Sequence, residues 1–438
     1  MNKTTFDIIG IGFGPANIAL AAALEERHVR REILFLEKMD APAWQPAMLL
    51  NGSDIQNHPL RDLVTPRNPR SRYSFTNFLH EHGRLFEYLN LGIEFPLRKE
   101  YSQYVTWVAG HFDHWVRYGS EVDSIRIQIR DGERIYVLTT NRAEVFTARS
   151  VVVAPGRTPL IPVPFSGINN DRVFHLTQYL PGIENYQRLY GKPRTICVIG
   201  GSQSAVELIL DLSSRFPTST ILNIQRGYGF SLKDTSPFSD RVYFPDHVDY
   251  YFDASPTSKV LLDEQLKRTN YSSADGDVIR KLYLTLYEQR LDRVEQIRIM
   301  TNTKIVAACS DDGGLLLGLE EIHRREGSQL RADLVILATG FRNLGPGPAQ
   351  ERIPPILAPI ANELMIDNQG VLQVARDYRL WRRKPDAPIP PIYLNGLCET
   401  SHGMGDAGSF SLLSLRSDLI AKSIEAALAD QPSLLQAS

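Results

Sequence analysis

Two glycine-rich segments, each placed between a short apolar run and a helical stretch, constrain the fold of this chain most strongly. The first apolar run covers residues 6–11 and leads into Gly10-Ile-Gly12-Phe-Gly14-Pro15. The second covers Thr195–Ile199 and leads into Gly200-Gly201-Ser202-Gln203-Ser204. A strand, a glycine turn and a helix in this order form the unit of a doubly wound parallel sheet that binds a dinucleotide. Two such units in one chain predict an α/β protein with two Rossmann-like domains.

The first glycine segment carries the features of a dinucleotide-binding turn. Gly10 and Gly12 allow a tight turn, and the amides that follow Gly14 at the start of the helix would face a pyrophosphate. Pro15 stands where the common fingerprint has its third glycine, and it is tolerated because the first helical turn does not need its missing N–H. Glu37 ends the next apolar run, where an acidic side chain accepts a hydrogen bond from a ribose hydroxyl. We expect these five residues to bind a cofactor.

The second glycine segment is followed by basic rather than acidic residues. Ser202 takes the place of a glycine in this turn. The next apolar run ends without an acid, because Arg226 stands there and Lys233 follows seven residues later. Basic side chains at this place favour a 2′-phosphate, and therefore NADPH. The alternative is that both are solvated surface charges.

The charge balance, the cysteine spacing and the length of the apolar runs exclude several classes of protein. The 438 residues carry 48 basic and 50 acidic side chains, a net charge of −2 that offers nucleic acid no broad electrostatic footprint. Three cysteines lie far apart without a CxxC, which argues against a disulfide framework, a metal site and a dithiol redox centre. No apolar run reaches the ~20 residues that span a bilayer. We expect a cytoplasmic flavoprotein without an integral membrane segment, with FAD in one nucleotide domain and a nicotinamide donor in the other.

Seven short segments, in order and spread over nearly the whole chain, resemble the flavin-dependent N-hydroxylating monooxygenases that act on the side-chain amine of ornithine or lysine in siderophore biosynthesis. They are Ile9–Asn17, Arg61–Pro69, Arg98–Tyr104, Asp234–Phe238, Thr269–Ser272, Ala338–Phe341, and Ser401–Gly403 with Asp406. Thr269–Ser272 and Ser401–Gly403 resemble the ornithine branch more than the lysine or diamine branches. The resemblance implies N-hydroxylation of a small, ornithine-like primary amine with NADPH, O2 and a C4a-hydroperoxyflavin, for a hydroxamate siderophore.

The resemblance also implies a domain organisation in which the NADPH domain is inserted into the FAD domain. The expected boundaries are residues 1–190 for the first part of the FAD domain, 191–340 for the NADPH domain and 341–438 for the second part. A small helical lobe over about 236–300 would close the amine pocket between the nucleotide sites. The sequence leaves the oligomeric state open, and a homo-oligomer is one state that it allows.

Roles for side chains outside the two turns also come from the resemblance. The additional cofactor-contacting set, with Gln56 beside the flavin, comprises Trp44, Gln45, Gln56, Gln203, Ser204, Arg226, Asp406 and Leu413. Arg61, Phe244 and Asn270 stand where the family holds its amino-acid substrate, and Gln56 and Asn270 are the candidate catalytic residues. No metal ligand is expected.

Several of these positions depart from the residues usual in the family. Trp44-Gln45 stands in place of a Trp-His pair, Arg61 in place of a lysine that holds the substrate carboxylate, and Phe244 in place of an asparagine. Arginine still clamps a carboxylate through two hydrogen bonds, but phenylalanine offers none. A carboxylate-free amine such as putrescine, cadaverine or histamine is therefore an alternative substrate.

Other readings of the same residues remain open from the sequence. The chain could be a non-oxygenating NADPH–flavin reductase or a flavin-binding sensor, which would form no hydroxylamine. Asn270 could cap a helix that begins near residues 272–275, and Arg61 could pair with Asp62 or Glu100.

Overall fold

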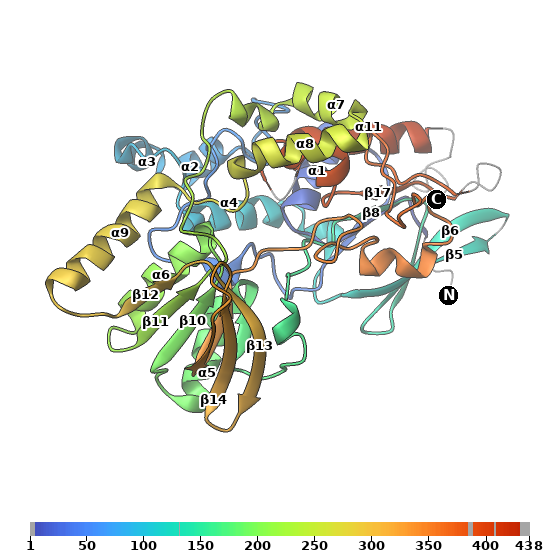
Figure 1. Ribbon diagram of the computed structural model, residues 1–438. Coiled ribbons are helices and arrows are strands. Elements are labelled where there is room, and N and C mark those ends of the chain that lie inside the picture. Colours follow the sequence, from blue (N-terminus) through green and yellow to red (C-terminus); the bar gives the residue numbers. More distant parts are fainter. Residues whose placement is uncertain (1–4, 131, 384–388, 407–408, 430–438) are drawn as a thin grey trace.

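The computed structural model describes residues 5–130, 132–383, 389–406 and 409–429, and it places two sheet-based units side by side (Figure 1). The first unit is built on a parallel sheet with the strand order β17-β8-β2-β3-β4. Its strands are β2 (Ile8–Ile11), β3 (Ile33–Leu36), β4 (Val116–Arg117), β8 (Val151–Val153) and β17 (Ile392–Leu394). All of β2 is buried, as expected for a parallel strand that is covered on both faces.

Helices and a smaller sheet cover this first sheet. Helix α1 (Pro15–Glu26) follows β2 and packs along α11 (Leu413–Leu428). The other helices here are α2 (Phe75–Glu81), α3 (Leu85–Leu91), α4 (Arg98–Gly110) and α10 (Glu399–His402). The smaller sheet has the order β1-β7-β6-β5, with β1 (Thr5–Phe6), β5 (Val122–Arg130), β6 (Glu133–Thr140) and β7 (Val145–Ala148). Because β17 and α11 come from the C-terminal part of the chain, the second unit is inserted into the first, as predicted.

The second unit repeats the parallel architecture. Its sheet has the order β12-β11-β10-β16-β9, and every pairing is parallel. The strands are β9 (Val173–His175), β10 (Thr195–Ile199), β11 (Thr220–Ile224), β12 (Ile297–Met300) and β16 (Leu334–Leu337). Helices α5 (Tyr179–Tyr190), α6 (Gln203–Arg215) and α9 (Gly276–Leu291) belong to this unit. An antiparallel sheet of β13 (Thr303–Asp311), β14 (Gly314–Glu321) and β15 (Gly327–Ala332) completes it.

The expected domain boundary at residue 190 is wrong, because the second sheet takes a strand from before that point. Strand β9 pairs with β16, and the α5 residues Tyr179, Ile183 and Tyr186 pack in the core of the second unit. A single apolar strand such as Val173-Phe-His does not reveal which of two sheets it will join. The second unit therefore begins well before residue 191.

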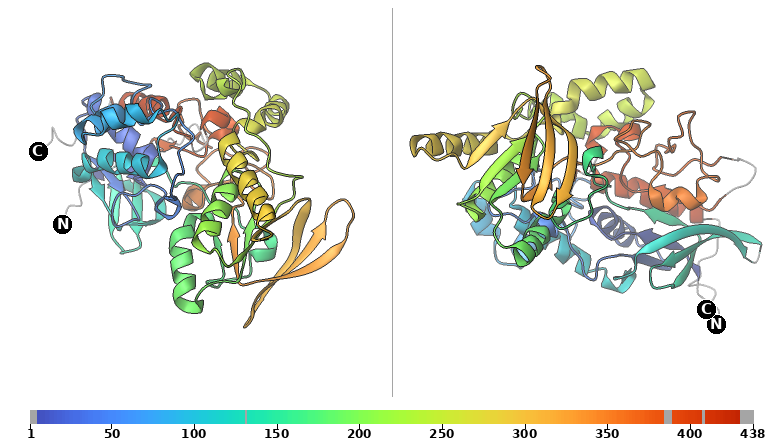
Figure 2. Two further views of the ribbon diagram at one scale, coloured as in Figure 1. Left: turned by 90° about the vertical axis from the view of Figure 1, so that its left-hand side faces the viewer. Right: turned by 60° about the horizontal axis from the view of Figure 1, so that its bottom comes forward.

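The helical lobe is also shorter than the expected range of 236–300. It consists of α7 (Pro245–Asp253) and α8 (Pro256–Leu266), which Figure 2 shows set apart from the second sheet and next to the C-terminal helices. Helix α9 packs on α6, and its Leu282 is buried in the core of the second unit. Short 3-10 turns occur at Pro46–Met48, Asp113–Trp115, Val163–Phe165, Leu176–Gln178, Ser239–Tyr243, Lys267–Thr269, Pro355–Ile360 and Met404–Asp406.

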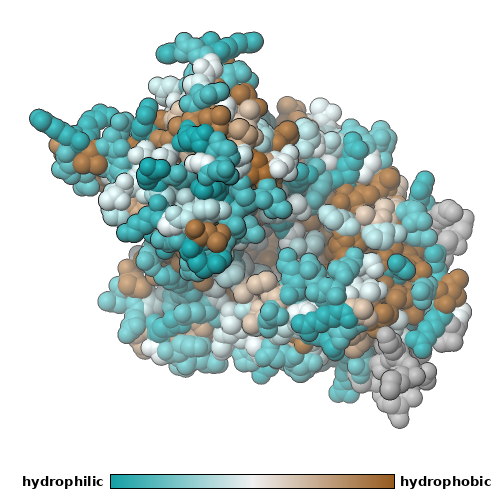
Figure 3. Space-filling view, turned by 90° about the horizontal axis from the view of Figure 1, so that it is seen from below, coloured by the Kyte–Doolittle hydropathy of each residue, from teal (hydrophilic) through white to brown (hydrophobic). Residues whose placement is uncertain are grey.

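The surface gives no sign of a membrane span in the part of the chain that is described. None of the described helices combines the length and the apolar character that crossing a bilayer requires. On the face shown in Figure 3, hydrophilic residues predominate and hydrophobic ones form separate patches.

Candidate functional site

A cavity of about 1930 Å³ lies where the two units meet. It exceeds the roughly 300–1,000 Å³ of a typical single-ligand site, so it has room for more than one ligand. The predicted site residues that line it are Trp44, Gln45, Gln56, Arg61, Gly200, Ser202, Gln203, Ser204, Arg226, Lys233 and Asn270. Those that lie outside this lining are Gly10, Gly12, Gly14, Pro15, Glu37, Phe244, Asp406 and Leu413. The cavity therefore unites most of the residues assigned to the second nucleotide and to the substrate.

The first glycine turn fits a pyrophosphate, although it stands apart from the lining of the cavity. Gly12 has a φ of +81°, and a Cβ there would lie 2.4 Å from the carbonyl oxygen of Ala154. Gly14 precedes α1, and nothing lies within 4 Å of the position that its Cβ would take. Open space in front of a helix N-terminus, bordered by a close-packed glycine turn, is what a dinucleotide phosphate requires. Pro15 occupies the first turn of α1, as expected.

Glu37 has a second role that the sequence did not reveal. Its Oε2 accepts a hydrogen bond from the Phe13 backbone N–H at 2.6 Å, and its Oε1 accepts one from the Met39 backbone N–H at 2.9 Å. The carboxylate thus braces the glycine turn itself. Each oxygen keeps a second lone pair, so Glu37 can still accept a hydrogen bond from a ribose hydroxyl.

A chain of buried polar side chains ties the first glycine turn to the C-terminal segment. Asn17 Nδ2 donates to the Gly12 carbonyl at 2.7 Å, and Asn395 Nδ2 donates to Asn17 Oδ1 at 3.1 Å. Arg416 then donates to Asn395 Oδ1 and to Asp406 Oδ1, both at 2.9 Å. Sequence reasoning missed Asn17, Asn395 and Arg416, because the link between Asn17 and Asn395 joins residues that are 378 positions apart. Burying these side chains is tolerated because each of them makes at least one hydrogen bond.

Asp406 and Leu413, which were predicted to contact the cofactor, are both buried in the protein interior. Asp406 is fully buried, and its Oδ1 also accepts a hydrogen bond from the Tyr378 hydroxyl at 3.1 Å. Its Oδ2 is buried without a partner among the described residues. The side chain of Leu413, the first residue of α11, packs in the core of the first unit. Any contact that Leu413 makes with a cofactor would have to come from its backbone.

The second glycine turn has the same architecture as the first. Gly200 has a φ of +147°, and a Cβ there would lie 2.3 Å from the Ala338 carbonyl oxygen. Ser202 caps α6 in an extended conformation, and its hydroxyl makes no capping hydrogen bond. Arg226 follows β11 at the cavity, is exposed and has no ion-pair partner among the described residues. Lys233 Nζ lies 3.8 Å from Asp275 Oδ1, so Arg226 is the better candidate for holding a 2′-phosphate.

Two glutamines that were predicted to face the cofactors meet at the N-terminus of α9. Gln56, from the first unit, donates its side-chain amide to the carboxylate of Asp275, the residue that precedes α9. Gln203 Oε1 accepts a hydrogen bond from the Asp275 backbone N–H at 2.9 Å. Burial raises the pKa of nearby Asp54 to about 6, and the charge of Asp275 adds to the shift. The cluster joins the two units at one edge of the cavity.

A buried ion pair makes a second connection between the units. Arg98, in α4, donates through both terminal nitrogens to the two carboxylate oxygens of Glu207 in α6, each at 3.0 Å. The same guanidinium donates to the carbonyl oxygens of Met48 and Asp54, again at 3.0 Å. The side chains of Arg98 and Glu207 are only 10% and 6% exposed. Arg98 thereby holds the loop that carries Gln56 against the second nucleotide unit.

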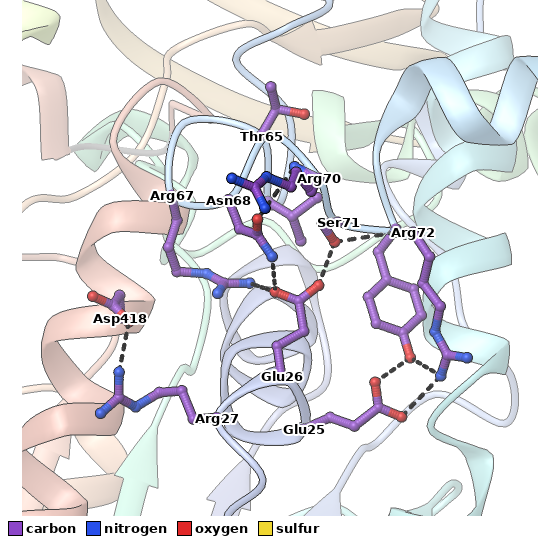
Figure 4. A network of polar contacts seen from close by, with 12 residues as sticks. Glu25, Glu26, Arg27, Thr65, Arg67, Asn68, Arg70, Ser71, Arg72 and Asp418 are labelled. Carbon is purple, nitrogen blue, oxygen red and sulfur yellow. Dashed lines mark hydrogen bonds and ion pairs between the residues drawn. The ribbon is translucent and has the colours of Figure 1, made fainter.

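The segment from Thr65 to Arg72 lies against the end of α1, as Figure 4 shows. Glu26 accepts hydrogen bonds from the side chains of Arg67, Asn68 and Ser71. Arg27, which follows the last residue of α1, pairs with Asp418 of α11 at 3.5 Å. Arg67 and Asn68 of this segment are thus explained by their hydrogen bonds to Glu26 of α1. Arg61 precedes these residues and faces the cavity.

Arg61 presents an uncommitted guanidinium to the cavity. Its Cζ lies 5.8 Å from the centre of the Tyr243 ring, a cation–π distance. The alternative pairings are not observed: Asp62 is buried and accepts from nearby backbone N–H groups, and Glu100 pairs with Arg84 at 3.3 Å. Within the described residues, Arg61 has no ion-pair partner. It therefore remains available for an anionic ligand.

The structure places Phe244 outside the lining of the cavity, and its assignment to the substrate site stays a prediction. Phe244 precedes α7, is 42% exposed and does not belong to the cavity lining, whereas Tyr243 does. The helix that starts at Pro245 turns the Phe244 side chain to the surface. Asn270 does line the cavity, and it caps no helix there, because Asp275 precedes α9.

Next to Asn270 lies a buried carboxylate that the sequence did not single out. The Tyr271 hydroxyl donates to Glu399 Oε2 at 2.6 Å, and Asn343 Nδ2 donates to the same oxygen at 2.7 Å. Tyr271 lines the cavity, whereas Glu399 lies behind it in α10. Burial raises the pKa of Glu399 to about 7, even though the Tyr271 hydrogen bond and the charge of Arg157 lower it.

The neighbouring Ser401–Gly403 segment connects α10 to the lobe. The His402 ring stacks on Tyr378 with centroids 4.1 Å apart, and burial lowers its pKa to about 4, so the ring is neutral. Gly403 has a φ of +89° and lies against Tyr251 of α7. The contact of this segment with the flavin remains a prediction.

The charged residues of the cavity suit anionic ligands. Arg61, Arg157 and Arg226 face it, and its acidic residues are Glu94 and Asp240. Across the described ranges, no cluster of three or more His, Cys, Asp or Glu side chains is arranged to hold a metal. The two glycine turns suit two dinucleotides. The basic cavity, with half-buried Asn270 in its lining, has room for one small molecule as well.

Comparison with known proteins gives a consistent result along the chain. The family model for L-lysine 6-monooxygenase/L-ornithine 5-monooxygenase matches residues 4–343. The L-ornithine N(5)-monooxygenase of Pseudomonas aeruginosa is 36% identical over 427 residues, which cover 95% of this chain and 93% of that protein.

Solved structures agree with the sequence comparison. The ornithine N-hydroxylase KtzI of Kutzneria sp. 744, in complex with reduced FAD, NADP+ and L-ornithine, matches with a TM-score of 0.88 and 33% identity over 97% of this chain and 99% of that one. An L-lysine 6-monooxygenase from Pseudomonas syringae matches with a TM-score of 0.84 and 35% identity over 97% of this chain and all of that one.

Proposed function

The chain belongs to the L-lysine 6-monooxygenase/L-ornithine 5-monooxygenase family, and we propose that it N-hydroxylates the side-chain amine of an ornithine-like α-amino acid with FAD, NADPH and O2. The observation that carries the proposal is Arg61, a guanidinium that faces the cavity and has no ion-pair partner among the described residues. A free cation beside Asn270 suits a substrate that carries a carboxylate as well as an amine.

The two glycine turns supply the cofactor sites in this proposal. FAD would lie on the first turn, with its pyrophosphate at the N-terminus of α1 and a ribose hydroxyl at Glu37. NADPH would lie on the second turn, with Ser202 and Ser204 near the phosphates and Arg226 at the 2′-phosphate. When bound, these cofactors supply the electrons and the oxygen chemistry, and the protein provides orientation and exclusion of water.

The substrate end of the cavity is formed by Arg61, Tyr243 and Asn270. Arg61 would hold the α-carboxylate with two parallel hydrogen bonds while its guanidinium lies over the Tyr243 ring. Because Phe244 lies outside this lining, its inability to form hydrogen bonds no longer speaks for a carboxylate-free amine. The hydroxylamine product is the chemical precursor of a hydroxamate, which fits a role in hydroxamate siderophore biosynthesis.

The test compares ornithine with its decarboxylated analogue, putrescine, in the wild type and in Arg61→Met. Methionine keeps the unbranched stem of the side chain and removes the guanidinium with its charge. Losing a charged hydrogen-bonding partner costs about 1.5–3 kcal/mol, so kcat/KM for ornithine should fall roughly 10- to 150-fold. The rate with putrescine should stay as it was, since putrescine has no carboxylate for Arg61 to hold.

Other outcomes of the same panel, extended to lysine, cadaverine and histamine, would overturn the proposal. A wild type that hydroxylates only carboxylate-free amines would reassign Arg61. Equal losses for ornithine and putrescine in Arg61→Met would show that Arg61 supports the cavity and not the carboxylate. NADPH oxidation without hydroxylamine from any amine would favour the reductase or sensor alternative.

A further inference from the structure

The proposed reaction requires a neutral amine, and the cavity has to remove a proton to produce one. A primary alkylamine has a pKa near ~10.4, so at neutral pH it arrives as an ammonium ion. Resting on the function proposed above, the question is which group of the chain accepts that proton. The acceptor must be ionised at working pH, reach the cavity and have no stronger commitment elsewhere.

Three carboxylates near the cavity, those of Glu207, Asp275 and Asp54, fail one of these conditions. Glu207 is bound on both oxygens by Arg98, and Asp275 is engaged by Gln56 and Lys233. Asp54 lies behind the cavity lining and, among the described residues, accepts no hydrogen bond from a hydroxyl that lines the cavity. Glu399 differs, because no cation of the described residues pairs with it directly and its hydrogen-bond donors are the neutral groups of Tyr271 and Asn343.

We propose that Tyr271 and Glu399 form a proton relay, in which the Tyr271 hydroxyl takes the proton of the substrate ammonium while its own proton passes to the Glu399 carboxylate. One N–H bond of the ammonium breaks, a new O–H bond forms on Tyr271, and the former Tyr271 proton ends on Glu399 Oε2. No electrons change hands. The amine is left neutral, with its lone pair free for oxygen transfer.

The geometry of the pair supports this direction of transfer. The Tyr271 oxygen lies 2.6 Å from Glu399 Oε2, a short charge-assisted hydrogen bond along which a proton can move. Tyr271 follows Asn270 directly, so the relay begins beside the predicted substrate residue. The carboxylate itself is shielded from the cavity, so it needs the hydroxyl as an intermediary.

Arg157 supplies the driving force at this position. Its Nη2 lies 3.3 Å from the Tyr271 oxygen, and its guanidinium stacks 4.8 Å from the centre of the Phe341 ring. A fixed positive charge close to the bound amine disfavours a second cation and so lowers the pKa of the ammonium. Arg157 contacts Tyr271 and Asn343 and not the carboxylate, so its charge acts on Glu399 only at a distance, where it lowers the pKa of that carboxyl.

With the other charged groups around Glu399 included, the pKa of its carboxyl lies near neutrality. Besides Arg157 and Tyr271, the carboxylates of Asp263 in α8 and Asp406 act on Glu399, and both raise its pKa. Burial raises that pKa to about 7 in total, so Glu399 ionises as the pH rises through this value. His402 is neutral over this range because burial lowers its pKa to about 4. Hydroxylation should therefore increase with pH through about 7 and then level off.

The first experiment records infrared difference spectra of the FAD- and NADP+-loaded enzyme when ornithine is added at pH 8. The wild type should gain a protonated-carboxyl band, because Glu399 receives the ammonium proton. Glu399→Gln and Tyr271→Phe should both lack the band. A wild type without it, or variants that retain it, would overturn the relay.

The second experiment measures hydroxylation against pH in the same variants. General acid–base groups contribute about 100- to 10,000-fold, so hydroxylamine formation in Glu399→Gln should fall at least about 100-fold and lose its rise near pH 7, while NADPH oxidation continues. Glu264→Gln, which neutralises an exposed carboxylate of the lobe, is the matched control and should keep the wild-type profile.

These outcomes separate the relay from the proposed function. A wild type that hydroxylates no amine would refute the function itself. A wild type that hydroxylates ornithine, together with a Glu399→Gln enzyme of the same pH profile, would refute the relay alone. Should Glu399→Gln fail to fold, Tyr271→Phe decides, since it removes only one hydroxyl and must reproduce the loss.

Discussion

Replacing Glu207 with alanine should destabilise the protein far more than the loss of an ordinary ion pair. In the folded chain, both carboxylate oxygens of Glu207 accept hydrogen bonds from Arg98 at 3.0 Å, and the two side chains are 6% and 10% exposed. Glu207→Ala leaves the guanidinium buried with only the carbonyl oxygens of Met48 and Asp54 as partners. An uncompensated charge in such surroundings costs about 3–5 kcal/mol.

The expected shift is measurable by thermal unfolding of the purified protein. A domain of 150–250 residues loses about 2–4 °C in Tm per kcal/mol, so Glu207→Ala should lower Tm by roughly 6–20 °C. The matched control is Asp311→Ala, which breaks the equally bidentate Arg331–Asp311 pair at 2.8 and 2.7 Å. Those side chains are about half exposed, at 51% and 48%, so water replaces the lost partner and the shift should be much smaller.

A double variant provides the decisive comparison. Arg98→Met with Glu207→Leu removes both charges and should be more stable than Glu207→Ala, because no buried charge is left unpaired. Glu207→Ala and Asp311→Ala with equal Tm values would refute the reasoning, since burial would then make no difference. A double variant less stable than Glu207→Ala would also contradict it.

The remaining predictions concern the two cofactor sites. Gly12→Val should abolish retention of FAD, because the new Cβ would lie 2.4 Å from the Ala154 carbonyl oxygen in a backbone with φ at +81°. A variant that purifies with its full flavin absorbance would contradict the assignment of FAD to the first turn. Arg226→Ala should raise KM for NADPH more than KM for NADH, and equal changes would remove its role at the 2′-phosphate. Lys233→Ala should discriminate less between the two dinucleotides than Arg226→Ala, because Lys233 already pairs with Asp275 at 3.8 Å; a larger effect would reverse the assignment.

The parts of this molecule that the sequence predicts well are those with local physical requirements. Gly12 and Gly200 are recognisable because a turn that approaches a neighbouring carbonyl closely admits no Cβ. Pro15 and Ser202 stand at helix starts, where short-range rules apply. The two Rossmann-like units and their insertion follow from such segments and from the family resemblance.

What the sequence did not reveal depends on contacts between distant residues. Nothing near Glu399 indicates that its carboxylate will be buried behind Tyr271, because the two are 128 residues apart. The link from Asn17 to Asn395 spans 378 residues. Strand β9 was assigned to the wrong side of a domain boundary for the same reason, since its partner β16 lies far along the chain. At Phe244 the difference is local, because the adjacent residue Tyr243 lines the cavity and Phe244 does not.

The measurement that tests the central claim most directly is the yield of hydroxylated product per NADPH oxidised, with hydrogen peroxide counted in parallel. With ornithine present, the account predicts nearly one hydroxylamine for each NADPH and little peroxide. Without an amine, it predicts slow oxidation that yields peroxide alone. Peroxide as the only product with every amine of the panel would contradict the account.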